Sequence, residues 1–96
     1  MAFDVKTAER QIDRISQQID TVHELRKSMV DYRKRLNGVW VAKEMNYINQ
    51  AIDSMTDRCS QLERQLERLE RDMARAVEDI LEEEAERDAA AAKLLL

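Results

Sequence analysis

Residues 33–40 read RKRLNGVW and interrupt an otherwise continuous helical pattern near the middle of the 96-residue chain. The first three residues of this stretch are basic, which suits the negative end of a helix dipole. The only glycine of the chain, Gly38, follows shortly after. Glycine commonly closes helices because it adopts the left-handed conformation without strain. Together these signals predict that a first helix ends near Leu36, with Gly38 left-handed.

The apolar residues before this turn repeat at alternating spacings of three and four, as in the seam of a coiled coil. The row is Val5, Ala8, Ile12, Ile15, Ile19 and Val22, continued by Leu25, Met29, Tyr32 and Leu36. The step from Val22 to Leu25 is three residues instead of four, a stammer that overwinds a coiled coil locally. With Asp4 as its N-cap, the pattern predicts a helix over about residues 4–36.

The apolar residues after the turn fill two rows of an unbroken heptad repeat. One row is Met45, Ile52, Cys59, Leu66, Met73 and Ile80, and the other is Val41, Ile48, Met55, Leu62, Leu69 and Ala76. The repeat predicts a second helix over about residues 40–82 or beyond. Residues 83–96 form an acidic, alanine-rich tail, and the pattern leaves open whether this tail is helical or frayed. The final Leu94-Leu95-Leu96 is either native or a cloning remnant.

Two helices joined by a short turn predict one all-α domain over residues 1–96, an antiparallel two-helix hairpin. Ala, Glu, Lys, Leu and Arg make up 47 of the 96 residues and proline is absent, which disfavours sandwiches, barrels and βα folds. The alternative is one continuous helix with Gly38 inside it, at a cost of about 1 kcal/mol relative to alanine. Because an isolated hairpin has a thin core, we expect it to complete a four-helix bundle with a second hairpin.

The charge distribution excludes several classes of partner. The net charge is −4, with +2 over residues 1–36 and −6 over residues 37–96, and seven acids lie between residues 78 and 88. An acidic chain does not suit the phosphate backbone of nucleic acids. The sequence shows neither an apolar segment of membrane-spanning length nor a signal peptide. We therefore expect a cytoplasmic protein, or one exported with its partner by a route that needs no signal peptide.

No residue pattern predicts catalysis, a cofactor, a metal or a small-molecule substrate. His23 has no second ligand at metal-binding spacing, and Glu82, Glu83 and Glu84 lack the glycine turn of a calcium loop. Cys59 lies in the seam, where a free cysteine behaves as a small buried hydrophobe. We therefore expect a non-enzymatic interaction protein.

The length, the hairpin layout and the turn Asn37-Gly38-Val39-Trp40 resemble the WXG-type small proteins of type VII secretion systems. The resemblance is closest to the small partner and targeting proteins of LXG toxins. It implies an adaptor or chaperone-like role, in which the hairpin bundles with the helical domain of a toxin or effector, or with a second small hairpin protein. The order here is Gly-x-Trp rather than Trp-x-Gly. No Tyr or Phe occurs after Tyr47 to form the family's export signal, which favours a partner that travels with a signal-bearing protein.

Two regions are candidate partner-binding surfaces. Trp40 follows the turn and is either a docking residue or a plug that closes the bundle beside Leu36. If Leu36 lies opposite Val41, residue n of the first helix faces residue 77 − n of the second. The first helix then leaves an apolar stripe uncovered near the end of the second. The stripe consists of Met73, Val77, Ile80 and Leu81.

A helix of a partner is expected on this stripe, with the acids of residues 82–88 against a basic surface. A second copy of the chain, or fraying of this end, is the alternative. For the function, the alternatives are a coiled-coil structural subunit or homodimer unrelated to secretion, and a helical chaperone of another secretion system.

Overall fold

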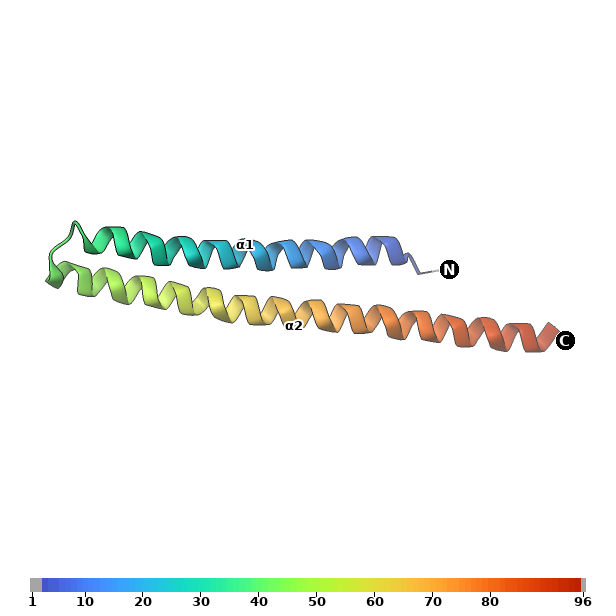
Figure 1. The fold of residues 1–96 in the computed structure, drawn as a ribbon. Coiled ribbons are helices and arrows are strands. Elements are labelled where there is room, and N and C mark those ends of the chain that lie inside the picture. Colours follow the sequence, from blue (N-terminus) through green and yellow to red (C-terminus); the bar gives the residue numbers. More distant parts are fainter. Residues whose placement is uncertain (1–2, 96) are drawn as a thin grey trace.

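The computed structural model of the protein describes residues 3–95 as two long helices side by side (Figure 1). Helix α1 spans Val5–Asn37 and helix α2 spans Ala42–Leu95, and they run antiparallel. The molecule measures 82 × 17 × 14 Å, with a radius of gyration of 22.7 Å. A compact globule of this length has a radius of gyration of about 12 Å. The all-α hairpin is confirmed, and one continuous helix is excluded.

Helix α1 begins with the predicted cap. The Asp4 carboxylate accepts hydrogen bonds from the backbone N–H of Thr7 at 3.1 Å and from its hydroxyl at 2.6 Å. These bonds from Thr7, the hydroxyl foremost, hold the pKa of Asp4 below its usual value. Asp4 therefore satisfies an N–H group that the first turn of a helix leaves without a partner.

The end of α1 differs from the prediction. Gly38 has φ −84° and ψ −10°, which is right-handed, so the expected left-handed closure is wrong. The backbone N–H groups of Val39 and Trp40 both donate to the Leu36 carbonyl at 3.0 Å. Because these right-handed turns already satisfy a terminal carbonyl of α1, no left-handed residue is needed.

Helix α2 spans Ala42–Leu95, whereas the heptad repeat predicts a helix over about residues 40–82 or beyond. Its first backbone bond runs from the N–H of Met45 to the carbonyl of Val41 at 2.9 Å. It continues past residue 82 to Leu95, so the part of the tail that the structure describes is helical. Leu96 lies outside the described residues.

The register between the helices also differs from the prediction. The backbone N–H of Phe3 donates to Glu84 at 2.8 Å, and His23 lies 3.2 Å from Glu63. Residue n of α1 therefore faces about residue 86 − n of α2, and the expected 77 − n is wrong. The reason lies in the turn, because residues 38–41 belong to neither helix and Val41 is exposed rather than packed against Leu36.

The stammer in α1 is absent from the packed face. After Val22, the less exposed positions continue with the spacing four, three, four, three, at Arg26, Met29, Arg33 and Leu36. Leu25 and Tyr32, which the apolar pattern selected, are instead 50% and 60% exposed. Two arginines thus occupy positions that face α2. They are tolerated there because Arg26 pairs with Glu63 and Arg33 pairs with Asp53.

Only one of the two predicted rows of α2 packs against α1. The row from Met45 to Ile80 is buried or half-buried throughout. The neighbouring positions that complete the packed face are mostly polar. They are Asn49, Thr56, Glu63, Glu70, Val77 and Glu84. The core is therefore thin: among the described residues only Val22, Met45 and Cys59 are buried apolar side chains.

Candidate partner-binding surface

The second predicted row of α2 remains largely exposed and forms one half of an apolar surface. Met55, Leu62 and Leu69 are 49%, 43% and 46% exposed. They recur every seven residues, so they lie on one side of the helix over two heptads. A row with this spacing is typical of a seam that packs against other helices.

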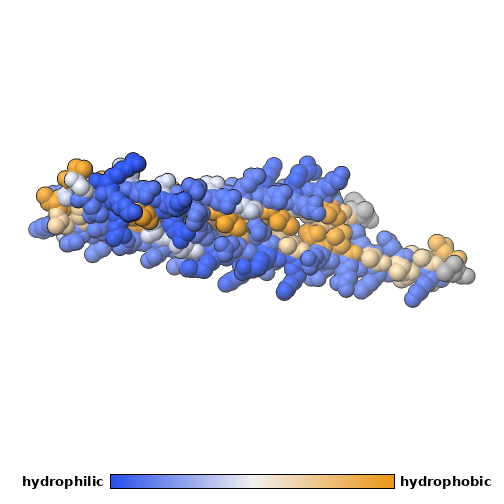
Figure 2. All heavy atoms as spheres, viewed as in Figure 1, coloured by the Kyte–Doolittle hydropathy of each residue, from blue (hydrophilic) through white to orange (hydrophobic). Residues whose placement is uncertain are grey.

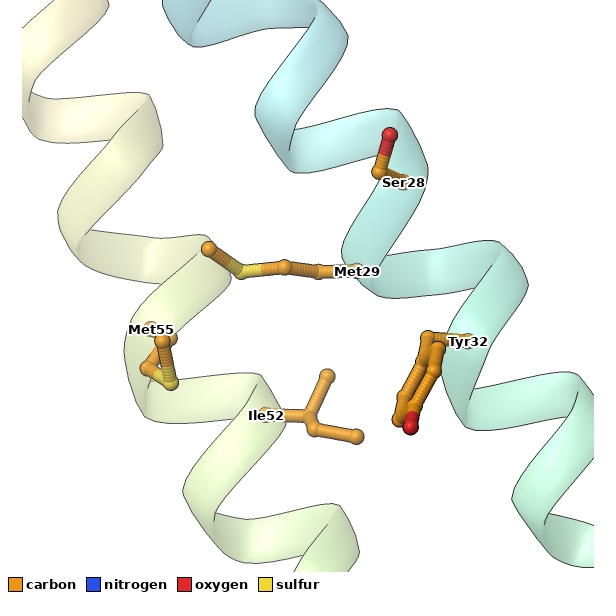
Figure 3. A pocket seen from close by; sticks show the side chains of 5 residues that line it. All are labelled: Ser28, Met29, Tyr32, Ile52 and Met55. Atoms are coloured by element: carbon orange, nitrogen blue, oxygen red, sulfur yellow. The ribbon is translucent and has the colours of Figure 1, made fainter.

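Helix α1 contributes the other half of this surface. Tyr32 and Met55 line a shallow hollow of about 290 Å³ together with Ser28, Met29 and Ile52. Figure 3 shows Met29 and Ile52 reaching across the gap between the helices, while Tyr32 and Met55 stand on either side of it. The hollow therefore has an apolar lining and lies open between the two helices.

The same arrangement repeats one heptad further along. Leu25 precedes Tyr32 by seven residues and Leu62 follows Met55 by seven, and the observed register places Leu25 beside Leu62. We call the five residues of this surface the exposed apolar face. They are Leu25, Tyr32, Met55, Leu62 and Leu69. Figure 2 shows apolar atoms along the line between the helices and around the turn, while hydrophilic side chains cover much of the remaining surface.

The opposite edge of the helix–helix contact is polar. Glu63 is only 9% exposed, and its carboxylate accepts from Arg26 at 3.3 Å and lies 3.2 Å from Nδ1 of His23. Arg26 also donates to His23 Nδ1 at 2.9 Å and to the Ser60 hydroxyl at 3.3 Å. These four side chains meet only when the helices keep the observed register, so they favour this register over a slipped one.

Sequence reasoning missed this polar cluster. His23 is not an isolated surface residue, because its ring lies against Glu63 and Arg26 from two helices. The available signal was the spacing of Arg26 and Arg33, which follow Val5, Ile12 and Ile19 at intervals of seven. A pattern that considers only apolar residues selects the neighbouring Leu25 and Tyr32 instead of these two arginines.

Trp40 lies in the turn, at one end of the hairpin. It is 45% exposed, and its neighbours Val39 and Val41 are 80% and 62% exposed. The backbone N–H of Trp40 donates a hydrogen bond to the Leu36 carbonyl, while much of the Trp40 side chain remains accessible to solvent. The turn end therefore carries a small apolar cluster that is separate from the exposed apolar face in the sequence.

Helix α1 covers most of the apolar stripe that the predicted register left uncovered. Because α1 reaches Glu84 through the N–H of Phe3, Met73, Val77 and Ile80 lie beside α1 and are half-buried. Leu81 is 39% exposed but lies on the opposite flank of α2 from Leu62 by helical geometry. The expectation that α1 leaves this stripe uncovered is therefore wrong for Met73, Val77 and Ile80, and only Leu81 remains exposed.

The part of α2 that extends beyond α1 is residues 85–95, and all of them are exposed. They are mainly alanine and charged residues up to Leu94 and Leu95. At the start of this segment, Arg87 donates to Glu83 at 2.9 Å, and this bond raises the pKa of the Arg87 guanidinium.

Within residues 3–95, no group of three or more His, Cys, Asp or Glu side chains is placed to hold a metal ion. In the same range, no helix combines the length and the apolar character that crossing a bilayer requires. Comparison of the chain with family models, with curated proteins and with solved structures finds no match.

Proposed function

We propose that this chain is a non-enzymatic interaction protein that completes a four-helix bundle by packing its exposed apolar face against another helical hairpin. The observation that supports this proposal most strongly is the exposed row Met55, Leu62 and Leu69, which follows a strict heptad spacing. Contiguous apolar surface of this kind on a charged helix is a feature of interaction sites. Burial of this surface would also compensate for a core that contains only three buried apolar side chains among the described residues.

Within this class, we favour an adaptor or targeting partner of a secreted toxin or effector in type VII secretion. The support is the resemblance of the hairpin and its Asn37–Trp40 turn to WXG-type proteins, with Trp40 partly accessible at the tip. The second candidate is a coiled-coil structural subunit that assembles with itself. The regular heptad rows along most of α2 favour that candidate independently of the resemblance.

A binding experiment tests the proposal. The helical region of an LXG toxin encoded beside this gene is mixed with the chain, and the dissociation constant is measured by calorimetry. Leu62→Glu is expected to weaken binding at least about 100-fold, because it places a charge in a desolvated apolar contact. Leu81→Glu is the matched control, since Leu81 has a similar exposure on the opposite flank.

Equal binding by wild type and Leu62→Glu would refute the exposed apolar face as the binding surface. Absence of any LXG toxin gene nearby, or no binding to its helical region, would refute the secretion role and leave the self-assembling subunit as the better candidate.

A further inference from the structure

Helix α2 carries a row of exposed arginines on the side that faces away from α1. They follow one another at spacings of four, three and four residues, so the row extends over three helical turns, about 16 Å. At about 100° per residue, the four positions fall within a band of about 60°. We call these residues the arginine stripe. They are Arg64, Arg68, Arg71 and Arg75.

The sequence places acids between these arginines, but the fold turns two of the acids towards α1. Glu63 is 9% exposed, and Arg26 and His23 contact its carboxylate. Glu70 is half-buried on the same face, and its Oε2 atom is buried without a hydrogen-bond partner among the described residues. Neither carboxylate pairs with the arginine stripe. Within residues 3–95, none of the four arginines forms an ion pair.

The positive surface of the arginine stripe is narrow, because exposed acids border it. By helical geometry, Glu67 lies on one flank and Asp72 on the other. Glu78 and Glu82 follow the arginines on the same side of α2. A wide anionic surface, such as a DNA duplex or a bilayer, would also place phosphates against these acids, and the whole chain carries a net charge of −4. A single line of carboxylates matches the arginine stripe without this repulsion.

We propose that the arginine stripe is a docking site for an acidic helix of another protein, with carboxylates at the same spacing of four, three and four. Arginine binds carboxylates through two parallel hydrogen bonds. Two helices with the same spacing bring four such pairs together in one register. No stretch of this chain carries four acids at this spacing, so a second copy does not supply the complete line. The occupant is therefore a different chain.

This docking site is separate from the exposed apolar face. Arg64 and Arg71 follow Leu62 and Leu69 by two residues, which places them about 200° further around α2. Partners can therefore bind both sides of α2 at the same time, and the hairpin links two helical proteins. The proposal goes beyond the proposed function, and either one can fail while the other holds.

The test measures binding of two synthetic peptides to the full chain by fluorescence anisotropy. The probe is an alanine-based helical peptide with four glutamates at the spacing four, three and four. The control peptide has the same composition, with its glutamates distributed around the helix. At an ionic strength of about 20 mM, where exposed charges are little screened, the probe is expected to bind at least about fivefold more tightly than the control peptide. Addition of salt is expected to weaken binding of the probe.

Two double variants locate the site. Arg64→Gln/Arg68→Gln is expected to weaken binding of the probe at least about fivefold, because two of the four pairs are lost. Arg10→Gln/Arg14→Gln is the matched control, since it removes two exposed arginines at the same spacing from α1. It is expected to weaken binding less than about twofold. Circular dichroism checks that both variants keep the helical content of wild type.

Several results would overturn the proposal. Equal binding of the two peptides, or equal losses in the two double variants, would show attraction to the overall charge only. No binding of the probe at about 1 mM would remove the docking site altogether. Tighter binding of a DNA duplex or of phosphatidylglycerol vesicles, lost in Arg64→Gln/Arg68→Gln, would assign the stripe to a phosphate surface instead. Self-association of the pure protein that the same variant abolishes would assign it to a second copy.

Discussion

Replacing Glu63 with leucine is expected to stabilise the protein, whereas replacing its partner Arg26 with methionine is expected to destabilise it. Glu63 occupies a position that faces α1, and its side chain is 11% exposed. Arg26 and His23, the groups nearest to its carboxylate, are 34% and 48% exposed. The carboxylate is therefore the buried member of the cluster, and the two nitrogen-bearing side chains can still reach water.

The magnitude follows from this asymmetry. Removing one partner of a fully buried ion pair costs about 3–5 kcal/mol, and an exposed pair contributes at most about 1 kcal/mol. Arg26 is one-third exposed and His23 remains 3.2 Å from the carboxylate, so we expect Arg26→Met to cost about 1–2 kcal/mol. Glu63→Leu instead buries a leucine, which contributes about 1.5–3 kcal/mol when burial is complete. Part of this contribution is offset, because Arg26 and His23 lose their contacts with the Glu63 carboxylate. We therefore expect Glu63→Leu to raise the free energy of unfolding by about 1 kcal/mol.

The measurement is urea unfolding followed by circular dichroism, at one fixed protein concentration so that any dependence of the free energy of unfolding on concentration is the same for every variant. The double variant Arg26→Met/Glu63→Leu completes the cycle and is expected to be more stable than Arg26→Met alone, since no carboxylate is then left without its partner. A loss above about 1 kcal/mol in Glu63→Leu, or a loss below about 0.3 kcal/mol in Arg26→Met, would refute the reasoning.

Three further outcomes follow from burial and capping. Met45→Ala should lower the free energy of unfolding by about 2–3 kcal/mol, because Met45 is only 4% exposed, whereas Tyr47→Ala, at 71% exposure, should change it by less than about 0.5 kcal/mol in the same urea titration. Cys59, 9% exposed, should react slowly with a thiol reagent in the native state and quickly in urea, and fast native labelling would contradict its buried position. Asp4→Ala should lower the melting temperature at neutral pH. Because the bonds from Thr7 depress the pKa of Asp4, the cap contributes above the usual carboxyl pKa and is lost as pH falls through the lowered value. The melting difference should therefore disappear in strong acid, and a difference that persists there would argue against the carboxylate as the cap.

The sequence alone determined the class of fold and the approximate extent of its helices. Heptad spacing marks a helix wherever it occurs, and Asp4 and the RKRLNG segment are local signals whose effect does not depend on the rest of the chain. Helix α1 ends within two residues of the predicted Leu36, and α2 begins within two residues of the predicted residue 40. The chemical nature of the exposed apolar face, an apolar row on a charged helix, was also present in the pattern.

Only the tertiary structure decided which apolar row is covered and where the helices meet. A heptad pattern repeats identically every seven residues, so it does not distinguish a register of 77 − n from one of 86 − n. That difference depends on the four residues of the turn and on the long-range contact between Glu63 and Arg26. Likewise, α2 carries two apolar rows on adjacent sides, but one neighbouring helix can cover only one of them fully. The row at Met55, Leu62 and Leu69 is exposed because α1 packs against the adjacent row, from Met45 to Ile80. No local property of those three exposed residues specifies that outcome.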